Sequence, residues 1–153
     1  MKKRTVQKLT QQQQDHRDAM IEEHGGEWKR SSSADQGYSF GTRHYINLSV
    51  QGLAELVDKN FADPHDRQND APEIGDLITF AMKVDELTEG KAEARFGGYV
   101  VERHRTDCRT SVDKVVVTGD LTPEVRSLFY KMLAHNHSNS FRDEPDHLWC
   151  WWG

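Results

Sequence analysis

The sequence has few cysteines, few prolines and no long apolar run. Its 153 residues include two cysteines and four prolines. Two thiols cannot form the framework of a disulfide-rich secreted domain, and without an export signal we expect them to be reduced. The basic start, Met1–Lys8, runs into glutamines rather than into the apolar stretch of a signal peptide. No apolar segment is long enough to span a membrane. We therefore expect a cytoplasmic protein that does not insert into membranes.

The sequence also lacks the complete motifs that mark common catalytic and nucleotide-binding sites. It contains no P-loop, no Gly-x-Ser-x-Gly elbow and no dinucleotide-binding glycine pattern. We therefore assign no catalytic residues and favour a non-enzymatic function.

Apolar residues make up 35% of the chain and charged residues 29%, so a few well-patterned segments must supply the core. A chain of this length can bury a large share of its surface without a metal or a disulfide. We expect a single domain over residues 1–153. Residues 1–9 are predicted to form a flexible basic terminus. Residues 63–72, rich in turn formers, are predicted to form a mobile loop.

Charge is unevenly distributed along the chain, whose net charge is −5. Residues 1–8 carry four cations and no acid, whereas eleven acids stand against four cations from Ala54 to Glu93. An acidic middle would repel nucleic acid. The sequence therefore predicts a charge-segregated surface and disfavours a dedicated nucleic-acid binder.

Three segments have the caps and apolar spacing of helices. Thr10 would cap a helix over residues 11–23, whose weak apolar stripe predicts weak docking at the surface. Ser49 begins a second helix, with apolar residues at helical spacing as far as Phe61. A third begins at Pro123, behind an N-cap signal. Its apolar stripe consists of Val125, Leu128, Phe129, Met132 and Leu133.

Alternation of apolar and polar residues predicts the strands. Residues 38–48 alternate in a way that places His44 on a buried face. A second hairpin is expected over residues 95–118, where Gly97 and Gly98 indicate a bulge or a close backbone approach. A further strand is predicted from the alternating residues Ile78, Phe80, Met82 and Val84. Together with a strand in the tail, these elements predict one α+β domain: a mainly antiparallel sheet of about five or six strands, two packed amphipathic helices and a weaker N-terminal helix.

The last nineteen residues combine large aromatic side chains with metal-ligand chemistry. In a strand, Trp149 and Trp151 would face one way and Trp152 the other, so both faces would carry large apolar area. Either the rest of the domain covers that area, or part of it is exposed to a partner. We take all three tryptophans as candidates for partner binding.

Four side chains of the tail have donor atoms suited to zinc. His135 and His137 are followed about ten residues later by His147 and Cys150. Such a set could form a structural site, or a catalytic site if water replaced one ligand. The alternative is that the first two histidines end a helix, where they complement the negative end of its dipole, and that Cys150 belongs to the core.

The second hairpin is rich in cations. Arg103, Arg105 and Arg109 are candidates for contact with a partner or with phosphate groups. Interleaved acids favour a solvent-exposed ladder of cross-strand charges instead. These acids are Glu102, Asp107 and Asp113.

These patterns favour a non-enzymatic binding, inhibitor or accessory protein that acts on a protein or nucleoprotein partner. The tail strand and the arginines would provide the surface. Small accessory proteins of viruses and mobile elements share this character, which is an analogy of type alone. Two alternatives remain: a zinc-dependent hydrolase or nuclease at the histidine cluster, and a nucleic-acid binder acting through the second hairpin. No cofactor is expected, apart from zinc in the hydrolase or nuclease alternative, and homo-oligomer formation is compatible with the sequence.

Overall fold

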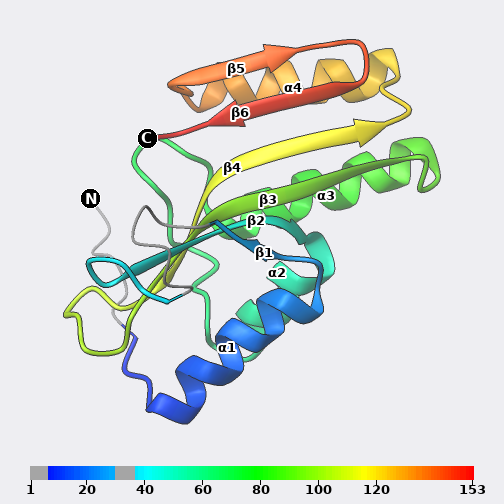
Figure 1. Ribbon diagram of the computed structural model, residues 1–153. Helices are drawn as coiled ribbons and strands as arrows, with labels where there is room; N and C mark the ends of the chain where they lie inside the picture. Colours follow the sequence, from blue (N-terminus) through cyan, green and yellow to red (C-terminus); the bar gives the residue numbers. More distant parts are fainter. Residues whose placement is uncertain (1–6, 30–36) are drawn as a thin grey trace.

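The computed structural model describes residues 7–29 and 37–153, which form one six-stranded sheet and four helices. Every pair of neighbouring strands is antiparallel, and the strand order is β1-β2-β3-β4-β6-β5 (Figure 1). The strands are β1 (Glu27–Trp28), β2 (Thr42–Ser49), β3 (Ala92–Val101), β4 (Thr110–Gly119), β5 (Ser140–Asp143) and β6 (His147–Trp151). The helices are α1 (Gln11–Glu23), α2 (Val50–Asp58), α3 (Ile74–Thr88) and α4 (Pro123–His135). The predicted α+β fold with an antiparallel sheet is confirmed.

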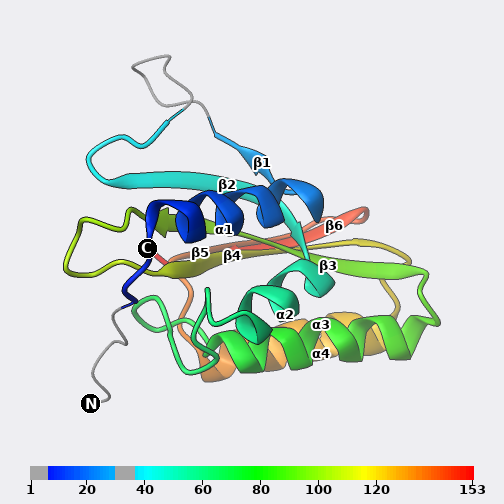
Figure 2. The ribbon, with the colours of Figure 1, turned by 90° about the horizontal axis from the view of Figure 1, so that it is seen from below.

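The helices form a layer on one side of the sheet. Figure 2 shows α2, α3 and α4 on the same side, and α1 packs against α2 and β2 at the β1–β2 end. The core lies between the layers, where the sheet contributes Leu48, Phe96, Val115, Val117, Leu148 and Cys150. No helix of the described residues lies on the opposite face, which we call the open sheet face.

Helix α1 has the bounds predicted from its cap, and it docks through the apolar residues Met20 and Ile21 and through a buried polar network. Thr10 forms a capping box with Gln13. Arg17 is fully buried and donates hydrogen bonds to the carbonyl oxygen of Val101 at 3.0 Å and to the hydroxyl of Tyr38 at 2.7 Å. It also pairs with Asp18 at 3.1 Å. The prediction of weak surface docking is therefore wrong, because an apolar stripe does not reveal a buried polar network.

The strand predicted at residues 78–84 is part of helix α3. Its buried residues recur at helical spacing over four turns: Ile74, Leu77, Phe80, Ala81, Val84 and Thr88. The alternation was misleading because Phe80 and Val84 fit both a helical and a strand periodicity. Met82, which the strand pattern would also bury, is 60% exposed. The segment spans 15 residues, a length typical of a helix rather than a strand.

His44 is exposed rather than buried. The buried residues of β2 are Tyr45 and Leu48, and the register shifts between them. Asn47 has a φ of 66°, which is typical of an irregular position such as a β-bulge. The simple alternation expected for residues 38–48 therefore fails at this irregularity.

The tail forms the hairpin β5–β6, and β6 pairs with β4 inside the sheet. The helix before it, α4, has the predicted Thr122 cap and proline at its first position. Of the predicted flexible terminus, residues 1–6 lie outside the described residues, and Gln7 donates a backbone hydrogen bond to Cys108. Within the loop of residues 63–72, Gln68 accepts a hydrogen bond from Tyr99 at 2.6 Å. The mobility of that loop stays a prediction.

Candidate functional site

Two tryptophans of β6 lie side by side on the open sheet face. Trp149 is paired with Val116 on one side and with Arg142 on the other, and Trp151 is paired with Lys114. Directly opposed residues of antiparallel strands share a face, so both indoles have cations as neighbours on this face. Trp149 is half-buried and Trp151 is 37% exposed. This part of the open sheet face thus combines aromatic area with positive charge.

The third candidate tryptophan is in the core. Trp152 is fully buried on the helix side, where its indole N–H donates to the carbonyl oxygen of Asn136 at 3.2 Å. Its backbone N–H donates to the carbonyl oxygen of Asp113 at 2.8 Å. The structure therefore brings Trp149 and Trp151 together and places Trp152 on the other side of the sheet.

A hollow of about 370 Å³ adjoins the two tryptophans, and we call it the lysine hollow. Gly98 of β3 lines it, and the neighbouring Gly97, which also has no side chain to fill the space, is paired with Lys114. A Cβ atom at Gly97 would lie only 3.4 Å from the side chain of Lys114. The residues that line the hollow come from four strands and from the position just after β1: Lys29, His44, Tyr45, Gly98, Asp113, Lys114, Trp149 and Trp151.

The paired glycines also form the predicted irregularity of the sheet. The register between β3 and β4 shifts between Gly97 and Gly98, which leaves Asp113 as the extra residue of a β-bulge. A Cβ atom at Gly98 would lie 2.8 Å from the hydroxyl of Tyr45, which donates to the carbonyl oxygen of Ser111 at 2.8 Å. The bulge turns both Asp113 and the adjacent Lys114 towards the hollow.

The charged groups of the lysine hollow perturb one another. Burial raises the pKa of Asp113, although the positive charge of Lys114 favours its ionised form. Burial also lowers the pKa of Lys114, and a hydrogen bond and like charge from Lys29 act in the same direction. Asp113 is hydrogen-bonded to Trp151, and His44 completes the set of titratable groups. Two ammonium groups and one carboxyl group therefore share a small, partly buried space.

The four predicted zinc ligands are not brought together. His147 and Cys150 are three residues apart in β6, so their side chains point to opposite faces. Cys150 is in the core, where burial raises the pKa of its thiol to about 12. His135 and His137 are exposed at the end of α4 and beyond it. Within residues 7–29 and 37–153, no group of three or more His, Cys, Asp or Glu side chains could hold a metal ion. His147 instead pairs with Asp146 at 2.9 Å.

The arginines of the β3–β4 turn are bound to other parts of the chain. Arg105 and Arg109 both pair with Asp107, at 2.6 Å and 3.0 Å. Although burial opposes ionisation of Asp107, these hydrogen bonds hold its pKa below the usual value. Arg109 also donates to the hydroxyl of Tyr99 at 2.6 Å. Arg103 donates to the side chain of Gln11 at 3.3 Å. These contacts favour the structural interpretation of the arginine cluster.

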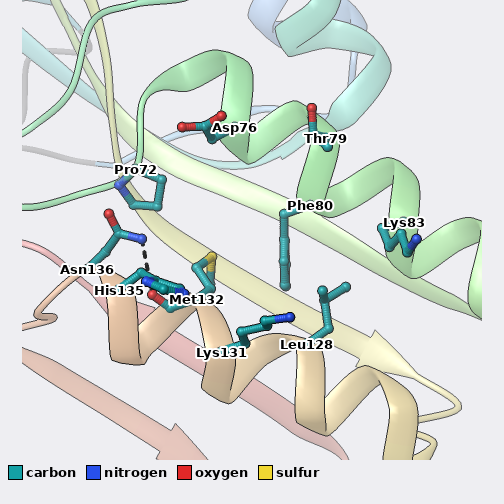
Figure 3. Close-up of a pocket in the computed structure, with 10 residues that line it drawn as sticks. All are labelled: Pro72, Asp76, Thr79, Phe80, Lys83, Leu128, Lys131, Met132, His135 and Asn136. Carbon is teal, nitrogen blue, oxygen red and sulfur yellow. Dashed lines mark hydrogen bonds between the residues drawn. The ribbon is translucent and has the colours of Figure 1, made fainter.

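A second hollow, of about 320 Å³, lies between α3 and α4 on the helix layer. Phe80, Leu128 and Met132 line it with apolar surface, as Figure 3 shows. Charged side chains, including Lys83 and Lys131, surround this apolar surface. This second hollow, which we call the α3–α4 groove, lacks the exposed tryptophan pair of the open sheet face. We therefore place the candidate site at the lysine hollow.

Comparisons of the chain with protein-family models, with curated proteins and with solved structures found no match. The function proposed for this chain therefore rests on the geometry and chemistry of its own residues.

Sequence reasoning identified the two tryptophans but missed the polar members of the site. Lys29, His44 and Lys114 are far apart in the chain and meet only through the strand order and register. The one sequence signal near them was the Gly97–Gly98 pair, which correctly indicated an irregular strand.

Proposed function

We propose that this chain is a non-enzymatic binding protein that engages a protein or nucleoprotein partner through its open sheet face. The observation that carries the proposal is the pair of tryptophans, Trp149 and Trp151, beside the lysine hollow. Exposed aromatic side chains next to polar groups are typical of the energetic centres of interfaces.

The position of the pair within the sheet supports this role. β6 lies between β4 and β5, so its backbone is paired on both sides and holds the two indoles on a rigid element. Asp113 is hydrogen-bonded to Trp151, and the C-terminal Gly153 lies against the ring of that tryptophan. A partner would therefore meet an aromatic surface that is already ordered, which reduces the entropy lost on binding.

Capture of partners from an extract of the source cells tests the proposal. The immobilised full chain is compared with the variant Trp149→Ala/Trp151→Ala and with Met82→Ala, a control that removes an exposed apolar side chain from the helix layer. The tryptophan variant is expected to weaken capture by about tenfold or more, because each interface tryptophan contributes about 1–2 kcal/mol or more. Circular dichroism checks that each variant is folded.

Equal capture by the wild type and the tryptophan variant would contradict the proposal. So would a loss of capture confined to Met82→Ala, since that result would place the partner on the helix layer.

A further inference from the structure

Within the proposed binding function, on which this inference rests, one class of partner fits the open sheet face best. We propose that the face binds single-stranded nucleic acid, with bases stacked on Trp149 and Trp151 and a backbone phosphate held by Lys29 and Lys114.

The two tryptophans provide a platform for bases. They are two residues apart in β6, so their side chains leave the same face roughly 7 Å apart. Aromatic side chains on a sheet receive the unstacked bases of a single strand, and this stacking tolerates any base because each has a π-face. A double helix would not offer its bases in this way. The platform therefore favours a single strand.

The two lysines provide the site for a phosphate. Lys29 and Lys114 line the same hollow, and like charge from Lys29 disfavours the protonated form of Lys114. An anion between them would relieve their repulsion and would restore an ordinary pKa to Lys114. Arg142, which is exposed and paired with Trp149, extends the positive charge beyond the platform. The cations thus lie on both sides of the aromatic pair.

One acid faces the same hollow and opposes anion binding. Asp113 lies beside both lysines and is hydrogen-bonded to Trp151, so it orients the indole. His44 also lines the hollow, which has two lysines against this one acid and is therefore formally positive. The carboxylate is expected to weaken binding without preventing it.

The acidic middle of the chain does not obstruct this face. Most of its acids lie in and around α2 and α3, which pack on the opposite side of the sheet (Figure 2), whereas Glu93 of β3 is exposed and pairs with Arg95. A polyanion would therefore be repelled from the helix layer and accepted only at the open sheet face. Because the net charge of the chain is −5, the salt dependence of nucleic-acid binding should reflect a few local contacts rather than a general attraction.

Binding of an oligothymidylate of about eight nucleotides, compared with an abasic strand of the same length, tests the inference. The full chain is titrated into each labelled strand, and fluorescence anisotropy gives the dissociation constant. The wild type is expected to bind the thymidine strand at least about fivefold more tightly than the abasic strand. Trp149→Ala/Trp151→Ala, or Trp151→Ala alone if the double variant does not fold, should abolish or reduce that preference.

The charge variants separate the phosphate site from the platform. Lys29→Ala/Lys114→Ala should weaken binding of both strands and reduce the slope of log affinity against log salt by about 0.7, because one phosphate contact is lost. The matched control, Lys83→Ala/Lys131→Ala, removes the same charge from the α3–α4 groove and should change neither strand. Asp113→Asn should strengthen binding of both strands.

Absence of oligonucleotide binding would overturn the inference, and so would equal affinity of the wild type for the two strands or loss of binding in the groove control. Displacement of the thymidine strand by an equal concentration of polyglutamate would also overturn it, in favour of an acidic protein partner. In each case, capture of a cellular partner that still depends on Trp149 and Trp151 would leave the proposed function standing.

Discussion

Trp151 and Trp152 are adjacent residues with different environments. Trp151 is on the open sheet face, whereas Trp152 is fully buried against the helix layer. Trp152→Ala should lower the free energy of unfolding by about 3–5 kcal/mol, because it leaves a large cavity in the core. Trp151→Ala should lower it by less than about 1 kcal/mol. Urea unfolding measures both values. Similar losses for the two variants would contradict the assignment of one residue to the core and the other to the binding surface.

Asp113 should make stability depend on pH. Burial raises its pKa above the ordinary value of 3.8, so the folded state binds the proton more tightly than the unfolded chain does. The resulting loss of stability is absent below about pH 3.8 and is complete once the pH exceeds the folded-state pKa. Asp113→Asn removes this loss, so the variant should be more stable than the wild type at pH 7 and should approach it below pH 3.8.

Urea unfolding of the two proteins at a series of pH values provides the measurement. A variant that is less stable than the wild type at pH 7 would show that the attraction of Lys29 and Lys114 for the carboxylate exceeds the effect of burial.

At the scale of the element, β6 is both part of the core and the carrier of the proposed site. It pairs with β4 and β5 and contributes Leu148 and Cys150 to the core. Removal of residues 148–153 should therefore abolish cooperative unfolding instead of merely preventing partner binding. Thermal unfolding followed by circular dichroism tests this expectation. A truncated chain that still melts in a sharp transition would show that the tail is an appended interface strand.

The success of sequence reasoning differed from element to element for physical reasons. Helices α1 and α4 were predicted because Thr10 and Thr122 are local capping signals that act within one turn. Helix α3 was misassigned because Phe80 and Val84 satisfy both helical and strand periodicity. The docking of α1 was missed because Arg17 is buried through partners distant in the sequence, namely Tyr38 and Val101. Local signals thus predicted the elements better than their contacts.

At the scale of the molecule, the candidate site depends on register, which a sequence does not specify by itself. The tryptophan pair followed from alternation along a single strand. The lysine hollow instead requires β3 and β4 to be paired with a bulge at Asp113, so that Lys29 from one edge of the sheet comes near Lys114. The same register directs Cys150 away from His147, so the predicted zinc ligands are separated. The zinc ligands suggested by proximity in the sequence therefore do not form a site, whereas residues from distant segments do form the lysine hollow.

The layered arrangement divides the surface into two faces of different character. The helix layer carries most of the acidic middle and an apolar groove, and the open sheet face carries the tryptophan pair and the lysine hollow. We expect partners to bind the open sheet face.

Site-specific photocrosslinking in the source cells tests that claim most directly. A photoreactive phenylalanine derivative is placed at position 151 on the open sheet face or at position 82 on the helix layer, which are both exposed. We expect covalent partner adducts from position 151 and few or none from position 82. Adducts formed only from position 82, or from neither position, would contradict it.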